Sequence, residues 1–262
     1  MAGSTAVSPD KVSGKEFQHL LASYESLIDV ISSSKGAKPG QKTLQELDQF
    51  RFSKAPALFS QDDPTRAMNH DDVKTLVDWK LRHGKFRPTL MKFVSSNDSS
   101  TVEETVKEAI DNYQDASGLS DALKTLAKLK GIGPATASLL LAVHYPKKIL
   151  FFSDEAYYWL CNKGQKTSLK YNMKEYDALN NEAEKLMKKL SVSAMDVEKV
   201  AYVLLKQESH LPKPTSDDST AKTAETSPKK PKESVPAKRK KSSDDMIEDK
   251  VPVRRSKRGK VA

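Results

Sequence analysis

Apolar side chains recur every three to four residues through most of the first 210 positions, which is the spacing of one face of an α-helix. Near the start this face holds Phe17, Leu20, Leu21, Tyr24, Leu27 and Ile28. The glycine- and proline-containing segment 36–40 closes that element, and a long connection is expected around Pro56 and Pro64. No segment alternates between apolar and polar residues over the length of a strand. The pattern therefore predicts an all-α fold.

Further helices follow along the chain. One begins at an Asp cap and ends at Gly84, with Val73, Leu76, Val77, Lys80 and Leu81 at helical spacing. Pro88 opens a short helix, and another carries the apolar positions of residues 102–110. Toward the C-terminus we expect helices over 119–129, 134–144, 154–162, 174–190 and 193–207. These elements predict one folded domain over residues 15–210, preceded by a disordered N-terminus of residues 1–14.

The most informative segment is the turn between the helices 119–129 and 134–144. It reads Leu129-Lys130-Gly131-Ile132-Gly133-Pro134-Ala135-Thr136-Ala137. Two glycines around one aliphatic residue predict a hairpin (residues 129–137) so tight that a Cβ at either glycine would clash. Pro134 suits a first helical turn, because its missing N–H costs nothing there. Backbone N–H groups then face outward at a helix N-terminus, where they can bind a DNA phosphate. The candidate DNA contacts are Lys130, Gly131, Ile132, Gly133, Ala135 and Thr136.

The hairpin, the apolar helix 138–143 and the segment Phe151-Phe152-Ser153-Asp154 together resemble the helix-hairpin-helix (HhH-GPD) superfamily of DNA glycosylases. The resemblance implies a two-lobed helical domain with its cleft near the hairpin, and double-stranded DNA as the partner. It implies Asp154 as the catalytic carboxylate, since the family places an Asp at this distance from the hairpin. It also implies that the carbonyl groups of the hairpin can hold a structural monovalent cation.

The chain departs from the family pattern at three places. Members that also cleave the DNA strand carry a lysine two residues after the second hairpin glycine, where this chain has Ala135, so a lyase reaction from this position is not expected. Many members bind an iron–sulfur cluster through four cysteines, but this chain has only Cys161 and therefore no such cluster. Glu155 and Ala156 follow the Asp where the family usually carries a hydroxyl or a His nearby.

Removing a base requires its rotation out of the stack into a pocket. A fixed carboxylate then stabilises the positive charge that develops on the sugar, or activates water. Asp154 can serve this purpose, although Ser153-Asp154 ahead of Glu155 is also an ordinary helix N-cap.

Residues 79–87 form a basic segment interleaved with aromatic side chains. Such a segment can bind phosphates, which makes Arg82, Lys85 and Arg87 further candidate DNA contacts. The alternative is a helix whose charges are solvated and whose apolar side, with Trp79, is core. His83 is expected at the surface or at the helix end rather than in catalysis.

The net charge of +9 is distributed unevenly over the 262 residues. Residues 211–262 carry 15 of the 44 Lys and Arg and 8 of the 35 Asp and Glu, a net charge of +7, against +2 for residues 1–210. The basicity therefore gives little support to DNA binding by the folded part. The single cysteine fits a reducing compartment, and no apolar run or N-terminal signal points to a membrane or to secretion. His, Cys and carboxylate spacings predict no metal site.

Residues 211–262 lack aromatic side chains and are rich in Pro, Ser, Thr and Lys, which predicts a disordered basic tail. One basic cluster has the spacing of a bipartite nuclear import signal: Lys229, Lys230, Lys238, Arg239, Lys240 and Lys241. A compact second cluster comprises Arg254, Arg255, Lys257 and Arg258. We expect an import receptor as a partner and the nucleus as the location. The alternative is a solvated tail that adds nonspecific phosphate contacts.

Two functions remain. The first is a monofunctional DNA glycosylase that acts in base-excision repair as a monomer and hydrolyses an N-glycosidic bond with the help of Asp154. The second is a catalytically inactive, glycosylase-like nuclear protein that binds DNA or serves as a scaffold.

Overall fold

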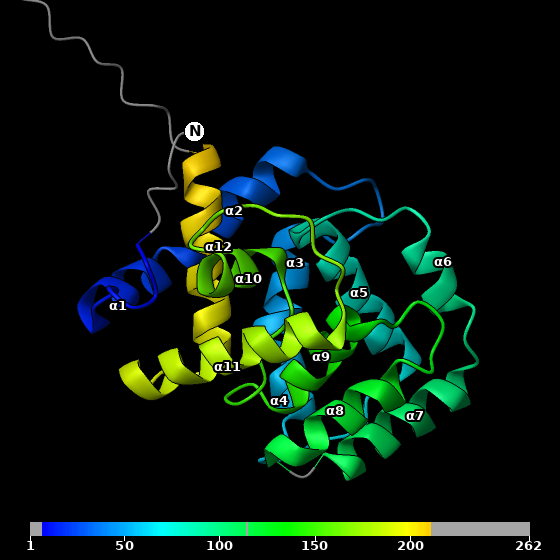
Figure 1. Cartoon of the computed structure of the whole chain (residues 1–262). Coiled ribbons are helices and arrows are strands. Elements are labelled where there is room, and N and C mark those ends of the chain that lie inside the picture. The colour runs from blue at the N-terminus through cyan, green and yellow to red at the C-terminus, as the bar shows by residue number, and fades with distance from the viewer. Residues whose placement is uncertain (1–6, 114, 211–262) are drawn as a thin grey trace, which may run out of the picture. The chain divides into compact units, whose positions relative to one another are not determined.

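The computed structural model describes residues 7–113 and 115–210, and every regular element within these ranges is a helix (Figure 1). The all-α prediction is confirmed for this part of the chain. The elements are α1 (Gly14–Ala22), α2 (Tyr24–Lys35), α3 (Leu44–Gln49), the π-helical turn η1 (Phe50–Lys54), α4 (Ala55–Phe59), α5 (His70–His83), α6 (Leu90–Ser95), α7 (Ser99–Asn112), α8 (Asp115–Leu126), α9 (Pro134–His144), α10 (Asp154–Cys161), α11 (Met173–Leu190) and α12 (Ala194–His210). The predicted tail, with both basic clusters, lies outside the described residues.

Helix α9 lies at the centre of the arrangement (Figure 1). Every residue from Ala135 to His144 is buried, and the helix contacts α4, α5, α8 and α11. A helix that is apolar on all sides has no face to present to water, so its neighbours must surround it. The hairpin at its N-terminal end is thereby fixed to the core. Within the described ranges, no helix has the length and apolarity needed to cross a membrane.

The N-terminal region differs from the prediction in two ways. The expected single helix is divided at Ser23, whose hydroxyl donates to the carbonyl of His19 and whose backbone N–H bonds the end of α1. Residues 7–13 are also held in place, because the indole of Trp159 donates to the carbonyl of Val7 at 2.8 Å and Val12 is buried. The disordered segment predicted over residues 1–14 is therefore too long.

The expected long connection around Pro56 is helical instead. Thr43 and Glu46 form a capping box that starts α3. Helices α3, η1 and α4 follow one another without a break, so Pro56 lies within one helical run over residues 44–59, just after the π-helical turn η1. Pro64 does lie in a connection, between α4 and α5. The prediction around Pro56 was wrong because this proline lies inside a continuous helical run, where the π-helical turn η1 passes into α4.

Helix α5 buries Trp79, in agreement with the core alternative for this residue. His83, one turn later, stacks on Trp79 with ring centroids 4.4 Å apart and on Tyr202 at 3.8 Å. Complete burial lowers the pKa of His83 well below its usual value, so the ring stays neutral. His83 is the last residue of α5, as one of the two expectations had it, but the expectation of a surface position was wrong, since residues four apart share the inner face of the helix.

Candidate functional site

The hairpin between α8 and α9 is held by a side chain that precedes α7. The amide of Asn97 accepts from the N–H of Lys130 at 2.8 Å and donates to the carbonyl of the same residue at 2.9 Å. A further bond to the carbonyl of Val94 ties Asn97 to the end of α6. The turn is therefore clamped from outside rather than held by its own residues alone.

The two hairpin positions hold a glycine for different structural reasons. Gly131 has φ of +80°, and a Cβ there would lie 3.0 Å from Val94 Cγ2 and 3.2 Å from the Val94 nitrogen. The predicted clash is confirmed at this position. Gly133 has φ of −97°, and a Cβ there would meet nothing within 4 Å. The prediction was wrong for Gly133, which caps α9 and faces open space.

This difference predicts two outcomes for the stability of the hairpin. Gly131→Ala should lower the free energy of unfolding by about 2 kcal/mol, because it forces a left-handed alanine against α6. Gly133→Ser should leave it within about 1 kcal/mol of the wild type, since serine is a good N-cap residue. Urea unfolding of both variants measures the contrast. Equal losses of stability in the two variants would show that Gly131 and Gly133 tolerate substitution equally, which would contradict the prediction.

The candidate contacts in the hairpin fall into two groups. The N–H groups of Lys130, Ile132 and Thr136 are engaged with Asn97, Leu129 and Gly133 respectively. In the described part of the chain, the N–H groups of Gly131, Gly133 and Ala135 have no protein acceptor. The side chains of Ile132 and Thr136 are buried, whereas that of Lys130 is exposed. Only part of the predicted set is thus free to bind an anion.

A buried serine connects the hairpin helix to Asp154. The hydroxyl of Ser138 on α9 donates to the carbonyl of Ala135 at 3.2 Å and accepts from the N–H of Phe152 at 2.9 Å. This second bond fixes the turn that leads into α10. The N-cap of α10 is Ser153, whose side chain accepts from the N–H of Ala156. Asp154 is therefore not needed to cap α10. Its position follows directly from that of the hairpin.

Asp154 is half-buried and takes part in a cluster with Tyr171 and Arg87. The hydroxyl of Tyr171 donates to Asp154 Oδ1 at 2.7 Å, and the guanidinium of Arg87 lies over the Tyr171 ring, 5.0 Å from its centroid. Burial and the Asp154 charge raise the pKa of Tyr171 above its usual range, which keeps the hydroxyl a donor. Tyr171 also has φ of +54°. A non-glycine residue held in this conformation costs energy that its surroundings must supply.

Asp154 lines a small cavity of about 40 Å³ at the meeting point of α5, α9 and α10. Ala135 of the hairpin, Arg87 and Tyr171 line the same cavity, together with Lys80 and Lys85. The second acidic residue at this cavity, Glu155, is paired with Lys206 at 2.8 Å. The three basic side chains Lys80, Lys85 and Arg87 thus outnumber the free carboxylate. This balance attracts anions to the opening.

The structure brings Lys85 and Arg87 to the Asp154 cavity, but not Arg82. The guanidinium of Arg82 donates to Asp78, to the carbonyl of Lys42 and to Gln41. These bonds link the connection before α3 to α5, so the Arg82 guanidinium already has hydrogen-bond partners within the protein. Arg82 contributes instead to a wider groove of about 780 Å³, which shares Gly84 and Arg87 with the Asp154 cavity.

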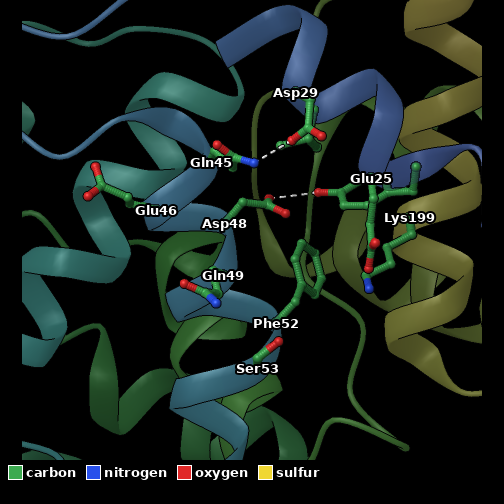
Figure 2. A pocket seen from close by; sticks show the side chains of 11 residues that line it. Glu25, Asp29, Gln45, Glu46, Asp48, Gln49, Phe52, Ser53 and Lys199 are labelled. Carbon is green, nitrogen blue, oxygen red and sulfur yellow. Dashed lines mark hydrogen bonds between the residues drawn. The ribbon is translucent and has the colours of Figure 1, made fainter. Parts of the chain in front are cut away.

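Another cavity, of about 390 Å³, opens beside α2, α3 and α12 (Figure 2). Its lining includes the carboxylates of Glu25, Asp29, Glu46 and Asp48 against the single ammonium of Lys199. Burial raises the pKa of Asp48, which accepts from Tyr24 and from Trp79. A site of this charge repels phosphate, so this cavity is a poor candidate for contact with nucleic acid.

Three residues of the site were missed by the sequence analysis. Lys80 left a signal, because a lysine stands in the apolar stripe formed by Val73, Leu76, Val77 and Leu81. Tyr171 lies in the connection between α10 and α11, and Asn97 in the one between α6 and α7, where no periodicity identifies a partner.

The described residues hold no group of three His, Cys, Asp or Glu side chains arranged to bind a metal ion. The candidate site consists of the hairpin, Asp154 and the basic side chains around them. No protein-family model, curated protein or solved structure matches the chain.

Proposed function

We propose that the protein is a monofunctional DNA glycosylase with a two-lobed, glycosylase-like helical domain, and that Asp154 is its catalytic carboxylate. The observation that carries the proposal is the shared cavity: Ala135 of the hairpin and Asp154 of α10 line it together, with Lys85 and Arg87. A hairpin with free N–H groups gives a phosphate a place to bind. A carboxylate directly beside it lies where the sugar of a bound strand would pass.

Each group at this cavity has a task in such a reaction. The Asp154 carboxylate stabilises the positive charge that builds on the sugar as the glycosidic bond stretches, or activates the attacking water. Tyr171 holds one carboxylate oxygen through its 2.7 Å hydrogen bond and leaves the other oxygen free to act. Lys85 and Arg87 are exposed and bind the neighbouring phosphates.

The volume beside Asp154 favours a second candidate, a glycosylase-like protein that binds DNA without base removal. A benzene-sized guest needs a cavity of roughly 150 Å³, whereas this one has about 40 Å³. An extruded base therefore has to lie in the adjoining groove of about 780 Å³, or the exposed segment 85–88 has to move. If the base does not enter the groove and the segment does not move, the protein binds DNA without removing a base.

Single-turnover base release distinguishes the two candidates. The full-length protein, in excess, is incubated at low salt with a panel of duplexes that each carry one damaged or mismatched base. Release of one base identifies a glycosylase and its substrate. Binding without release across the panel supports the non-catalytic candidate, and absence of binding contradicts both.

Gly133→Asp tests the contact between hairpin and phosphate. Aspartate is a good N-cap residue, so α9 should keep its stability. Its negative charge lies where the phosphate should approach, so the affinity for duplex DNA should fall about tenfold, with a smaller loss for Gly133→Ser as the neutral control. Fluorescence anisotropy at several salt concentrations measures both affinities. Unchanged affinity in Gly133→Asp would show that the hairpin does not meet the backbone.

The two basic clusters of residues 211–262 support the remaining part of the proposal. We infer that Lys238–Lys241 with Lys229 and Lys230, and separately Arg254–Arg258, bind a nuclear import receptor and bring the protein to nuclear DNA. We also take the acting form to be a monomer.

A further inference from the structure

The acidic cavity beside α2, α3 and α12 takes no part in the proposed function. It has a volume of about 390 Å³ and is lined by Glu25, Asp29, Glu46 and Asp48, with Lys199 as its single basic side chain. In the part of the chain that the structure describes, none of these four carboxylates forms a salt bridge. A concave surface with an excess of one charge attracts the opposite charge, so the cavity favours a cationic ligand.

Asp48 provides a second, independent indication of a ligand. It is 8% exposed, and its Oδ1 atom accepts from the hydroxyl of Tyr24 at 2.8 Å and from the indole of Trp79 at 2.9 Å. The other oxygen, Oδ2, has no hydrogen-bond partner within residues 7–113 and 115–210, and Asp48 extends from α3 into the cavity (Figure 2). A carboxylate oxygen removed from bulk water needs a donor to offset its lost hydration. An ammonium group that enters the cavity supplies this donor.

The chain itself shows how the cavity holds an ammonium group. The Nζ atom of Lys199 lies over the rings of Phe52 and Tyr24, 4.8 and 5.2 Å from their centroids. The two rings meet edge to face, with centroids 5.5 Å apart. Aromatic ring faces attract cations, and the attraction is stronger where water is partly excluded. The cavity therefore combines aromatic faces with carboxylates, and this combination suits a lysine side chain.

The arrangement of the lining residues favours a peptide over a metal ion or a simple polyamine. Among the described residues, no three His, Cys, Asp or Glu side chains converge closely enough to bind a metal ion. A benzene-sized guest needs roughly 150 Å³, so a cavity of about 390 Å³ has room for a lysine side chain. Gln49 and Ser53 also line the cavity, and neither side chain has a hydrogen-bond partner in the described chain. Their amide and hydroxyl groups can bond a peptide backbone, which a polyamine lacks.

We propose that this cavity binds a lysine-bearing peptide segment of another protein, with one ammonium group donating to Asp48 Oδ2 and a second one lying near Glu25 and Asp29. The complementary charge of such a segment is the reason for this choice of partner. The ammonium of Lys199 competes with the incoming one for the ring faces and so limits the affinity. The cavity shares no lining residue with the Asp154 cavity, so the proposal stands independently of base removal and of DNA binding.

Fluorescence anisotropy with the full-length protein tests the proposal. The probe is a fluorescein-labelled peptide of four Gly-Lys repeats, and a peptide of four Gly-Glu repeats is the control ligand, which should not bind. Asp48→Asn should weaken binding of the lysine peptide about tenfold, because asparagine can still accept from Tyr24 and Trp79 but carries no charge. If that variant does not fold, Glu25→Gln takes its place, since it removes no hydrogen bond of the described structure and should weaken binding about threefold.

Glu103→Gln is the matched control for these variants. Glu103 is an exposed carboxylate on α7 that does not line the cavity, so this variant should bind the lysine peptide like the wild type. An equal loss of affinity in the control and in the cavity variants would show that only the net charge matters. That result, or a wild type that does not bind the lysine peptide, would overturn the proposal.

Lys199→Met provides a readout in the opposite direction. It keeps most of the side-chain stem and frees the faces of Phe52 and Tyr24, so the affinity for the lysine peptide should rise about fivefold. Lys107→Met on α7 removes the same charge from an exposed position outside the cavity and should leave the affinity unchanged. A fall in affinity with Lys199→Met, or an equal rise with Lys107→Met, would contradict binding in this cavity.

Two further arms distinguish the source of the ammonium groups. Spermine carries several of them without a peptide backbone, and displacement of the probe by an equal concentration of spermine would identify a polyamine site instead. The joint replacement of Lys238, Lys240 and Lys241 by alanine removes lysines of the same chain that could compete. Equal affinity of this variant and the wild type for the probe supports a partner protein. Tighter binding by the variant, lost again on adding Asp48→Asn, would assign the cavity to the chain's own lysines and overturn the proposed partner.

Discussion

Replacing Asp154 with Asn is expected to slow single-turnover base release by about 10²- to 10³-fold. The asparagine can still accept the hydrogen bond from Tyr171, so the site keeps its geometry. It carries no charge to offset the positive sugar in the transition state. Tyr171→Phe removes the hydrogen bond but keeps the carboxylate, so its loss of rate should be smaller. Comparing the rates of Asp154→Asn and Tyr171→Phe separates the effect of the carboxylate charge from the effect of its positioning by Tyr171.

The Asp154→Asn variant should bind duplex DNA at least as tightly as the wild type, because it removes a negative charge near the phosphates. Asp121→Asn on α8 is a control, since this exposed carboxylate pairs only with Lys124 in the described structure. Equal rates of base release in Asp154→Asn and wild type would exclude Asp154 as the catalytic carboxylate.

Glu198→Ala should lower the free energy of unfolding by about 3–5 kcal/mol. Glu198 on α12 and Arg51 in η1 form a salt bridge of 2.9 Å between side chains that are 2% and 1% exposed. The Arg51 atoms Nε and Nη1 have no hydrogen-bond partner among the described residues, although its guanidinium lies over the rings of Phe52 and Trp79. Removing the carboxylate would leave a fully buried and unpaired cation. Urea unfolding measures the loss.

The joint replacement Arg51→Met with Glu198→Leu supplies the matched control. Burial raises the pKa of Glu198 to about 7, although the charge of Arg51 beside it acts in the opposite direction. Apolar side chains of similar volume avoid the cost of burying charge, so the double variant should have a stability near that of the wild type or above it. A large loss in the double variant would show that the pair itself, and not the isolated charge, determines stability.

The sequence predicts two long helices near the candidate site almost residue by residue, whereas the helix expected over 119–129 is α8, Asp115–Leu126. Residues 134–144 and 174–190 were expected to be helical, and α9 and α11 cover 134–144 and 173–190. Both are long enough for periodicity to average out local exceptions. The helical run of α3, η1 and α4 over residues 44–59 was missed because a proline predicts an interruption, whereas the chain continues as a helix through Pro56.

Apart from Lys85 and Arg87, the site was predicted only in the parts that follow one another along the chain. The hairpin and Asp154 are separated by a short segment whose geometry Ser138 fixes, so their proximity follows from local structure. Lys80 and Tyr171 reach the same cavity from other elements of the chain. Their placement depends on how α5 and the connection before α11 pack against α9 and α10, and single-sequence patterns do not encode such packing.

The anchoring of residues 7–12 has a consequence for the order in which the chain acquires its structure. The Val7 carbonyl accepts a hydrogen bond from the indole of Trp159, and the Asp10 carbonyl accepts one from the ammonium of Lys189 at 2.7 Å. These partners are 152 and 179 positions away. During synthesis the segment emerges first and meets its partners only after residues 159 and 189 have been made, so completion of the fold requires the closure of a long loop.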